Sequence, residues 1–329
     1  MKISIAMATY NGARFLREQL DSIATQTLLP YELVICDDGS TDATLEIAGQ
    51  FAKEVSFPVR IYKNDKNLGY ADNFLKAASL CEGDWIAFCD QDDVWLPHKL
   101  ATMSRQFRSG ILLVLHSAEL VDAALNPSGK RWPDLKKNRV VEPLQNRPWW
   151  TPAGFTQCVS AELIRNYSWQ FRPHDFNYPE KLQAHDEWTY FLANSLGRIA
   201  YIKESLALYR RHDNTVTGSY NTSFGDRLKG AKAAGANHYM MLSRIAGEYV
   251  ATISKFKNKG ETFPNSQAAA NYYKWLSDRL VLRSKLHSGA GLFGRLSIFL
   301  RLCHSGAYGS SVGKGLGIKA LLKDFVALI

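Results

Sequence analysis

The first hundred residues repeat one pattern four times: a short apolar run, then polar residues, then a helical pattern. The apolar runs, each long enough for one buried strand, are residues 3–8, 32–36, 59–62 and 85–88. This regular alternation predicts an α/β fold with a parallel, doubly wound sheet. In such sheets ligands bind beyond the carboxyl ends of the strands, so the polar residues after each strand form the candidate site.

Four polar clusters follow these strands and are expected at one edge of the sheet: residues 9–11, 37–42, 64–69 and 90–93. The last cluster places three carboxylates, Asp90, Asp92 and Asp93, within four positions. Carboxylates packed this closely repel one another unless a cation lies among them, and hard cations such as Mg²⁺ take oxygen ligands. Taken alone, the cluster fits a solvated acidic turn equally well. The convergence of four clusters on one edge favours the metal.

Composition limits the class of protein. Hydrophobic residues make up 46% of the 329, enough for one large α/β domain with an appendage, or for two domains. The five cysteines are scattered and lack C-x-x-C spacing, which favours reduced thiols without a structural zinc. No signal peptide precedes the first strand, and no apolar run is long enough to span a bilayer. These features predict a cytoplasmic protein.

The positive charge is concentrated in the last third of the chain. Residues 220–329 contain 16 Lys and Arg against 5 Asp and Glu, whereas residues 1–219 contain 24 against 26. Helical patterns, several of them apolar with embedded basic residues, cover residues 228–256, 271–286, 289–303 and 315–329. We therefore expect two domains, residues 1–220 and a basic helical region at 221–329.

Two interpretations of this helical region stay open. Basic amphipathic helices are typical of contact with a membrane, here its inner face, while a helical packing domain or a homodimer interface is the alternative. Nucleic acid is not expected as a partner, because long apolar runs interrupt the positive charge. Residues 122–152 are irregular and predict a long functional loop, and Trp149 and Trp150 next to it are candidates for a sugar-stacking wall or for core packing.

The polar clusters also resemble the motifs of a known family. Ala-Thr-Tyr-Asn-Gly at 8–12, Asp-Asp-Gly-Ser-Thr-Asp at 37–42, Asn-Leu-Gly at 67–69 and Asp-Gln-Asp-Asp at 90–93 occur in the order and spacing of family 2 glycosyltransferases. Residues 185–188 and 209–214 extend the resemblance to about residue 218. It implies the GT-A fold, a Rossmann-like, mainly parallel sheet. The finer resemblance is to a bacterial rhamnosyltransferase-like branch.

The resemblance implies an activity. The family transfers a sugar from a nucleotide-diphosphate donor, with inversion at the anomeric carbon. For this branch the implied donor is a dTDP- or UDP-sugar. The implied acceptor is a hydroxyl of a glycan or of a polyprenol-linked lipid, in the biosynthesis of cell-surface polysaccharide.

The resemblance also assigns donor-binding residues. Thr9 and Tyr10 would contact the nucleoside, and Asp37 or Asp38 would accept the imide N–H of its base. The remaining positions of these motifs that would contact the donor are Asn11, Asn67, Gly69 and Gln91.

The implied metal is Mg²⁺ or Mn²⁺, bridging the diphosphate. Asp92 would bind it, and Asp90 would lie near the ribose or a metal-bound water. His212 would be a further metal or diphosphate contact, and Arg210 or Arg211 would add positive charge. The metal would neutralise charge that builds on the departing nucleoside diphosphate.

Inversion by direct displacement needs a base on the face opposite the leaving group, to take the proton of the acceptor hydroxyl. Asp186 matches the base position of the family, and Glu187 is the alternative. Without the other motifs, Asp186 would be an ordinary acid in the first turn of a helix.

Two departures from the family pattern are relevant. Asp72 and Asn73 stand where many relatives carry Arg and Asn, and His185 precedes Asp186 where relatives often carry Glu.

Two other functions remain as alternatives. One is a non-catalytic scaffold that binds nucleotides or glycans on the same fold. The other is a nucleotidyltransferase, although the first loop lacks the glycines and basic residues that usually hold a triphosphate. Neither the dinucleotide motif G-x-G-x-x-G nor the P-loop occurs.

Overall fold

The computed structural model describes all residues except 213–234, 258–263, 289–290, 310–314 and 329. The chain divides into two compact units. The first consists of Met1–Glu142, Trp150–Gln170 and Gln183–Asn214, and the second of Pro143–Trp149, Phe171–Leu182 and Thr215–Ile329. The second unit thus takes two short segments from within residues 1–220. The predicted boundary between residues 220 and 221 lies outside the described residues.

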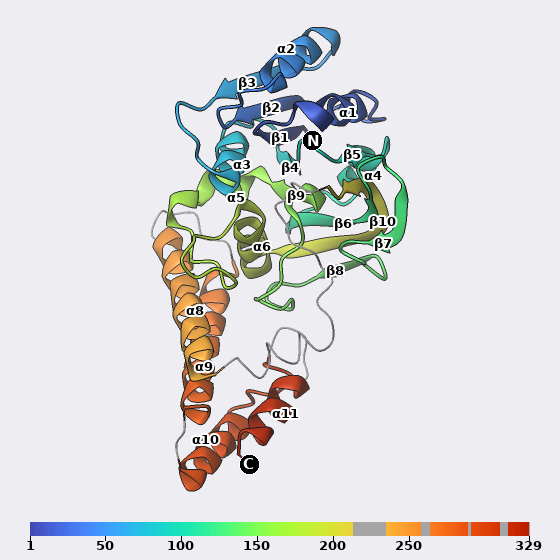
Figure 1. The fold of residues 1–329 in the computed structure, drawn as a ribbon. Helices are drawn as coiled ribbons and strands as arrows, with labels where there is room; N and C mark the ends of the chain where they lie inside the picture. Colours follow the sequence, from blue (N-terminus) through green and yellow to red (C-terminus); the bar gives the residue numbers. More distant parts are fainter. Residues whose placement is uncertain (213–234, 258–263, 289–290, 310–314, 329) are drawn as a thin grey trace. The chain divides into compact units, whose positions relative to one another are not determined.

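The first unit contains one mixed sheet in the strand order β3-β2-β1-β4-β9-β6-β10-β5, with β7 beside β6 and β8 beside β10 (Figure 1). Its amino-terminal half is parallel and consists of β1 (Ile3–Thr9), β2 (Glu32–Asp37), β3 (Val59–Lys63) and β4 (Trp85–Cys89). The connecting helices are α1 (Ala13–Ala24), α2 (Thr44–Glu54) and α3 (Tyr70–Ser79). Strand and helix alternate as the apolar runs predicted.

Alternation along the strands gives the sheet two apolar faces. Ile3, Ile5 and Met7 of β1 pack in one cluster with Leu16 and Leu20 of α1. On β4, Phe88 belongs to the other face, because its ring meets Phe74 of α3 at 6.0 Å and His185 of α6 (His185–Leu196) at 4.8 Å. The sheet is therefore covered on both sides, as a parallel sheet requires.

The second half of the sheet is mixed. β9 (Gln157–Ser160) runs antiparallel to both β4 and β6 (Ile111–Val121), and β6 pairs in parallel with β10 (Arg198–Arg210). The short helices around it are α4 (Lys99–Ser104), α5 (Ala161–Asn166) and two 3₁₀ turns at Gly154–Thr156 and Trp169–Phe171. The predicted α/β class with a mainly parallel sheet is confirmed.

The sequence pattern does not predict four short strands: β5 (Val94–Trp95), β7 (Pro127–Arg131), β8 (Arg139–Val141) and β9. The prediction that residues 122–152 are irregular throughout was wrong, since β7 and β8 lie there. All five residues of β7 are exposed, so this edge strand carries no apolar alternation that a sequence could reveal.

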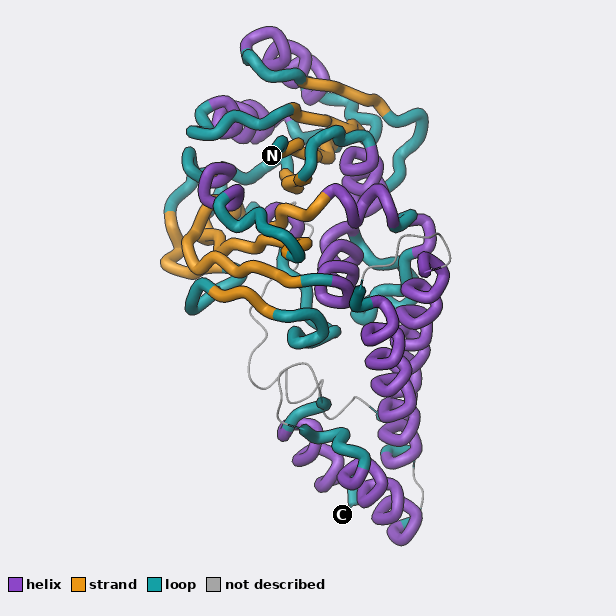
Figure 2. The backbone as a smooth tube through the Cα atoms, turned by 180° about the vertical axis from the view of Figure 1, so that it is seen from behind, coloured by secondary structure: helices purple, strands orange, loops and turns teal. Residues whose placement is uncertain are grey.

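The second unit is helical. α8 (Ala236–Lys257) packs along α9 (Ser266–Leu286), followed by α10 (Leu292–His304) and α11 (Ile318–Val326) (Figures 1 and 2). The four predicted helical stretches overlap these helices, and the predicted residues before 235 lie outside the described part. Within the residues that the structure describes, no helix is both long and apolar enough to cross a membrane.

Candidate functional site

The carboxyl ends of neighbouring parallel strands bring the polar clusters together. Thr9 of β1 is in register with Asp37 of β2, and its hydroxyl donates to Asp37 Oδ2 at 2.9 Å. β4 pairs on the other side of β1, with Cys89 opposite Met7. The clusters after β1, β2 and β4 therefore meet at one edge of the sheet.

The two acids after β2 organise the backbone around them. Asp37 is fully buried and accepts the backbone N–H groups of Gly39 at 3.1 Å and Ser40 at 2.9 Å. Asp38 accepts the N–H groups of Leu68 at 2.7 Å and Gly69 at 2.8 Å, and so ties the cluster after β3 to the cluster after β2. The protein's own donors thus occupy much of the accepting capacity of both carboxylates.

Asn67 and Gly69 shape the same loop. Asn67 Nδ2 donates to the carbonyl of Asp38 at 3.1 Å, and Gly69 has a φ of 79°, in the region that favours glycine. Asn73, which follows on α3, donates to Cys36 O at 2.8 Å and accepts from Asn64 at 2.9 Å. Asn73 therefore fixes the loop from below, a role that the sequence did not indicate.

Gln91 clamps the turn after β1. Its Oε1 accepts from Tyr10 N at 2.9 Å, and its Nε2 donates to Tyr10 O at 3.1 Å. A Cβ on Gly12 would stand 2.2 Å from Gln91 Oε1, so only glycine admits this clamp. Asn11 has a φ of 47° and accepts from Thr41 N at 2.9 Å. The Tyr10 side chain is left half exposed above this turn, at 52%.

Arg210 binds the acidic cluster from inside the protein. Its side chain is 2% exposed, with Nε donating to Asp92 O at 2.7 Å, Nη1 donating to Ala123 O at 2.7 Å, and Nη2 paired with Glu18. Its backbone N–H donates to Asp93 Oδ1 at 3.0 Å. This geometry makes Arg210 a positioning residue and argues against its predicted contact with a donor. Arg211, half-buried beside the Tyr209 hydroxyl at 3.0 Å, is the alternative cation.

Asp92 and His212 lie in direct contact. His212 Nε2 is 2.8 Å from Asp92 Oδ2, although 120 positions separate them in the chain. The imidazole also packs against Phe15 of α1, with ring centroids 4.9 Å apart. The structure thus brings together the two side chains that were predicted as metal ligands.

The acidic cluster is electrostatically strained. Burial, and then the charges of Asp92 and Asp186, raise the pKa of Asp90 to about 8. Burial, and then the charges of Asp92 and Asp90, raise the pKa of Asp93 well above its ordinary value. Beneath them, burial lowers the pKa of Lys99 to about 7. Lys99 Nζ donates to Phe155 O at 2.8 Å and lies 3.6 Å from the centre of the Trp95 ring. The single amine of Lys99 cannot balance the charges of Asp90, Asp92 and Asp93.

A divalent cation fits this arrangement. Mg²⁺ is commonly held by one or two carboxylates together with substrate phosphates and water. Asp92 and His212 offer one carboxylate and one imidazole at the rim, the sheet edge where the polar clusters meet. A cation beside them would relieve the repulsion that Asp90 experiences. Among the described residues, no group of three or more His, Cys, Asp and Glu side chains could hold a metal alone. A cation here would therefore need oxygen atoms from a ligand.

Asp186 stands at the amino-terminal end of α6 and is partly exposed, whereas Glu187 is buried at 8%. Asp186 Oδ1 accepts the N–H of Glu187 at 2.9 Å, and its backbone carbonyl accepts from Gln157 Nε2 at 3.1 Å. Its charge contributes to the raised pKa of Asp90. Exposure favours Asp186 over Glu187 as the accessible acid.

His185 holds the start of α6 in place. Its ring stacks on Phe74 with centroids 4.0 Å apart and an interplanar angle of 26°. A Cβ on Gly154 would come within 2.1 Å of His185 Nε2. The sequence singled out His185 only as a departure from the family pattern, and its packing role depends on distant residues.

Trp149 and Trp150 pack in different units. Trp149 packs in the second unit against Phe176 and Tyr249, each at 5.7 Å, and Trp150 packs in the first unit against Tyr190 at 5.3 Å.

The sequence is similar to known glycosyltransferases. The model of the family described as Glycosyl transferase family 2 matches residues 4–166. An uncharacterized glycosyltransferase of Nostoc sp. is 28% identical over 302 residues, covering 88% of this chain and 91% of that protein. The dTDP-rhamnosyl transferase RfbG of Shigella flexneri is 29% identical, covering 68% of this chain and 77% of RfbG. An uncharacterized protein of Mycobacterium tuberculosis is 30% identical over 69% of this chain. The match spans only 63% of the length of that mycobacterial protein.

Solved structures share the fold. TarS 1–349 of S. aureus superimposes with a TM-score of 0.56 at 18% identity, covering 100% of this chain and 81% of that one. Its complex with UDP-GlcNAc gives a TM-score of 0.55 at 17% identity, covering 100% of this chain and 89% of that one. The first unit accordingly has the GT-A fold. Residues 4–166 match the Glycosyl transferase family 2 model, and the chain is similar to a glycosyltransferase over most of its length.

Proposed function

We propose that the protein transfers a sugar from a nucleotide-diphosphate donor to an acceptor hydroxyl, with inversion at the anomeric carbon. One observation carries the proposal. The polar clusters of a family 2 domain are hydrogen-bonded to one another at a single edge of the sheet, and Asp186 lies close enough to Asp90 to raise its pKa. These clusters would form the donor site, and the accessible carboxylate of Asp186 would lie beside it.

The donor would lie along the clamped loops. Tyr10 is exposed above the turn that Gln91 fixes, and its ring can stack on the base. Asp37 and Asp38 hold the backbone around the nucleoside, with Thr9 and Asn11 supporting them. Asn67, Gly69 and Arg211 complete the predicted donor contacts. TarS, which shares the fold, is seen with UDP and with UDP-GlcNAc, which favours a nucleotide sugar here.

Mg²⁺ or Mn²⁺ is the cofactor that the rim suits. Asp92 and His212 would hold it, and the bound cation would supply charge neutralisation for the departing nucleoside diphosphate. Asp90 would lie on the ribose side or near a metal-bound water. Arg210 keeps Asp92 and Asp93 in place from behind.

Asp186 would act as the base. Its carboxylate must lie within hydrogen-bond reach of the acceptor hydroxyl and take its proton as that oxygen attacks. Its hydrogen bond from Glu187 N orients the carboxylate. Glu187 is buried and remains the alternative base.

The finer assignment is a hexosyl transfer in cell-surface polysaccharide biosynthesis. The similarity to RfbG, a dTDP-rhamnosyl transferase, supports a dTDP- or UDP-sugar as donor. We infer a glycan or polyprenol-linked acceptor at the inner face of the cell membrane. The basic helical region 221–329 would contact either that membrane or a second copy of the chain.

A donor screen tests the function. Thermal unfolding would be followed with UDP, dTDP and GDP, each with and without Mn²⁺, and binding should raise the melting temperature by mass action. The nucleotide that binds would then be supplied as radiolabelled sugar donors with membrane lipid extract. Metal-dependent binding of one diphosphate and label transfer to a lipid or glycan are expected. Absence of both, for every donor, contradicts the proposal.

A further inference from the structure

α10 and α11 each present an exposed apolar face. On α10, Leu292, Leu296 and Leu300 recur every four residues and therefore share one side of the helix. Phe293 next to them is 87% exposed, the highest value among the large hydrophobic side chains of the described residues. The exposed hydrophobic residues of α11 follow the same helical spacing: Ile318, Leu322, Phe325 and Val326.

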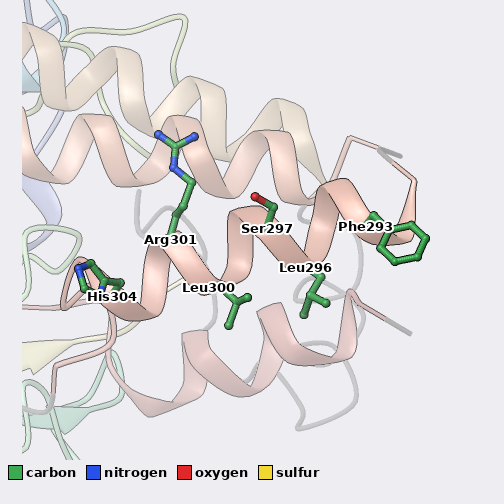
Figure 3. A pocket seen from close by; sticks show the side chains of 6 residues that line it. All are labelled: Phe293, Leu296, Ser297, Leu300, Arg301 and His304. Atoms are coloured by element: carbon green, nitrogen blue, oxygen red, sulfur yellow. The ribbon is translucent and has the colours of Figure 1, made fainter.

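The opposite side of α10 packs in the core of the helical unit. Leu302 is fully buried in a cluster with Leu286 and Ala307, against which Ile298 and Phe299 pack. The exposed leucines are therefore a second apolar side that this core does not use. A surface pocket on α10 is lined by Phe293, Leu296, Ser297, Leu300, Arg301 and His304. Figure 3 shows these side chains along one face of α10, with Leu296 and Leu300 on one edge of that face and Arg301 on its other edge.

A buried polar network fixes α11. Asp324 is fully buried and accepts two hydrogen bonds of 2.7 Å from Arg283 of α9, with His287 at 3.0 Å and the Tyr308 hydroxyl at 2.7 Å. Arg295 Nη1 of α10 donates to Ala327 O at 2.7 Å, directly after α11. These contacts fix α10 and α11 to the rest of the helical unit, so both apolar faces are exposed in the folded protein.

The charge around these faces has one sign. Residues 289–329 contain a single acid, Asp324, which is buried and paired with Arg283. Exposed basic groups stand next to the apolar residues, namely Arg301 and His304 on α10 and Lys319 on α11. Apolar side chains bordered by Lys and Arg are the pattern of helices that lie in the interface of an anionic bilayer.

We propose that the exposed faces of α10 and α11 form a docking surface for an anionic lipid bilayer. Leu296, Leu300 and Phe293 enter the boundary between headgroups and acyl chains, together with Ile318 and Leu322. The basic residues contact lipid phosphates. The surface is independent of the proposed sugar transfer, because no residue of the donor rim takes part.

Charge favours a bilayer over a second copy of the chain. A twofold interface places the same patch on both subunits, so Arg301 and Lys319 would face like charges. No exposed acid within residues 289–329 could pair with them. An anionic lipid surface provides the complementary charge together with an apolar interior.

Vesicle co-sedimentation of the full chain tests the surface. The vesicles would be phosphatidylcholine alone, or phosphatidylcholine with about one third phosphatidylglycerol. The wild-type chain should bind the anionic vesicles at least about tenfold more strongly. Replacing Leu296 and Leu300 by Glu should weaken this binding at least about tenfold, because charge enters the apolar contact. Replacing Arg301 and Lys319 by Glu should abolish the preference for anionic lipid.

Matched controls lie on α8 and α9 of the same unit. Met240→Glu changes a side chain that is 46% exposed on α8, and Lys274→Glu reverses an exposed charge on α9. Both should bind vesicles like the wild type. Equal loss in these controls, equal binding by all variants, or no binding by the wild-type chain would overturn the proposal.

Two further readouts separate the outcomes. Sedimentation velocity without lipid shows whether the face is instead a contact between copies. Suppose that the wild-type chain forms a dimer, that replacing Leu296 and Leu300 by Glu dissociates this dimer, and that the wild-type chain does not bind vesicles. The face is then a contact between copies, and the proposed bilayer contact is wrong. Binding of a nucleotide diphosphate should be the same in all these variants. If no nucleotide binds but vesicle binding follows the expected order, the docking surface stands and the proposed transferase activity fails.

Discussion

At the scale of single residues, the candidate site depends on unequal surroundings for similar acids. Asp37 and Asp38 accept several backbone donors, whereas Asp90 and Asp93 are crowded by like charges and burial. The first pair is suited to hold loops, and the crowded group is the one at which we propose a cation. Asp186, partly exposed at a helix start, is suited to proton transfer.

Asp186→Asn should lower kcat by about 10²–10⁴-fold, because general base catalysis typically contributes that much. The Kd for the nucleotide diphosphate should stay within about twofold, since Asp186 is proposed to touch the acceptor. Steady-state transfer kinetics and calorimetry measure the two quantities. Glu187→Gln is the matched control, and a larger kcat loss there would make Glu187 the base.

Asp92→Asn should raise the Mn²⁺ concentration for half-maximal activity by at least about tenfold, because the site loses its charged ligand. Titration of Mn²⁺ at a saturating donor concentration measures it, and chelation by EDTA should abolish activity in the wild type. Asp134→Asn, a change in an exposed ion pair outside the rim, should leave the titration unchanged. An unaltered Mn²⁺ requirement in Asp92→Asn would remove Asp92 from the metal site.

At the scale of elements, α6 is positioned by packing against one face of the sheet. His185 lies between Phe74 of α3 and Phe88 of β4, and Gly154 leaves room for its ring. The position of Asp186 therefore depends on three elements that are distant in sequence.

Gly154→Ala should lower the free energy of unfolding by about 1–3 kcal/mol, because its Cβ would overlap the His185 ring. It should also lower kcat by displacing Asp186. Gly49→Ala in α2 is the control, since a Cβ there meets nothing within 4 Å. That change should stabilise the protein by about 0.5–1 kcal/mol. Denaturant unfolding of both variants tests the expectation, and equal effects would contradict it.

The buried hydrogen-bond network around Asp324, which anchors α11, gives a second prediction at this scale. Burial alone would raise the pKa of Asp324, but hydrogen bonds from His287 and Arg283 outweigh it and lower the pKa. A carboxylate with a lowered pKa stabilises the fold above its ordinary pKa, and this contribution is lost as the pH falls through the folded value. The helical unit should therefore lose stability on acidification below about pH 4.

Asp324→Asn should destabilise the helical unit by about 3–5 kcal/mol at neutral pH, because Arg283 would keep a buried charge without its partner. The stability of this variant should also no longer fall through the titration of residue 324 on acidification. Asp278→Asn, in an exposed pair with Lys274, should change stability by less than about 0.5 kcal/mol. Circular dichroism melts between neutral and acidic pH compare the two, and similar melts would reject the anchor.

At the scale of the whole molecule, charge and chemistry are divided between the two units. The proposed donor site lies in the first unit, whose sequence is nearly neutral, and the basic surplus lies in the helical second unit. Nucleotide binding and lipid binding are accordingly expected to respond to different variants.

Calorimetric unfolding of the whole chain tests this division. A nucleotide diphosphate with Mn²⁺ at a hundredfold excess over Kd should stabilise the chain by about 2.7 kcal/mol. Asp324→Asn should retain this increment although its helical unit melts earlier. Asp92→Asn should lose the part that requires Mn²⁺. Loss of the increment in Asp324→Asn would show that the units do not act separately.

The sequence by itself determined the parallel half of the fold and the rim clusters. Apolar runs and turn residues are local signals, and the carboxyl ends of adjacent parallel strands share one edge. Only the tertiary structure decided which side chains face one another. His212 meets Asp92 across 120 positions, Arg210 turns inward to Glu18, and His185 packs against Phe74. Such pairings depend on long-range packing, which leaves no periodic signal in the chain.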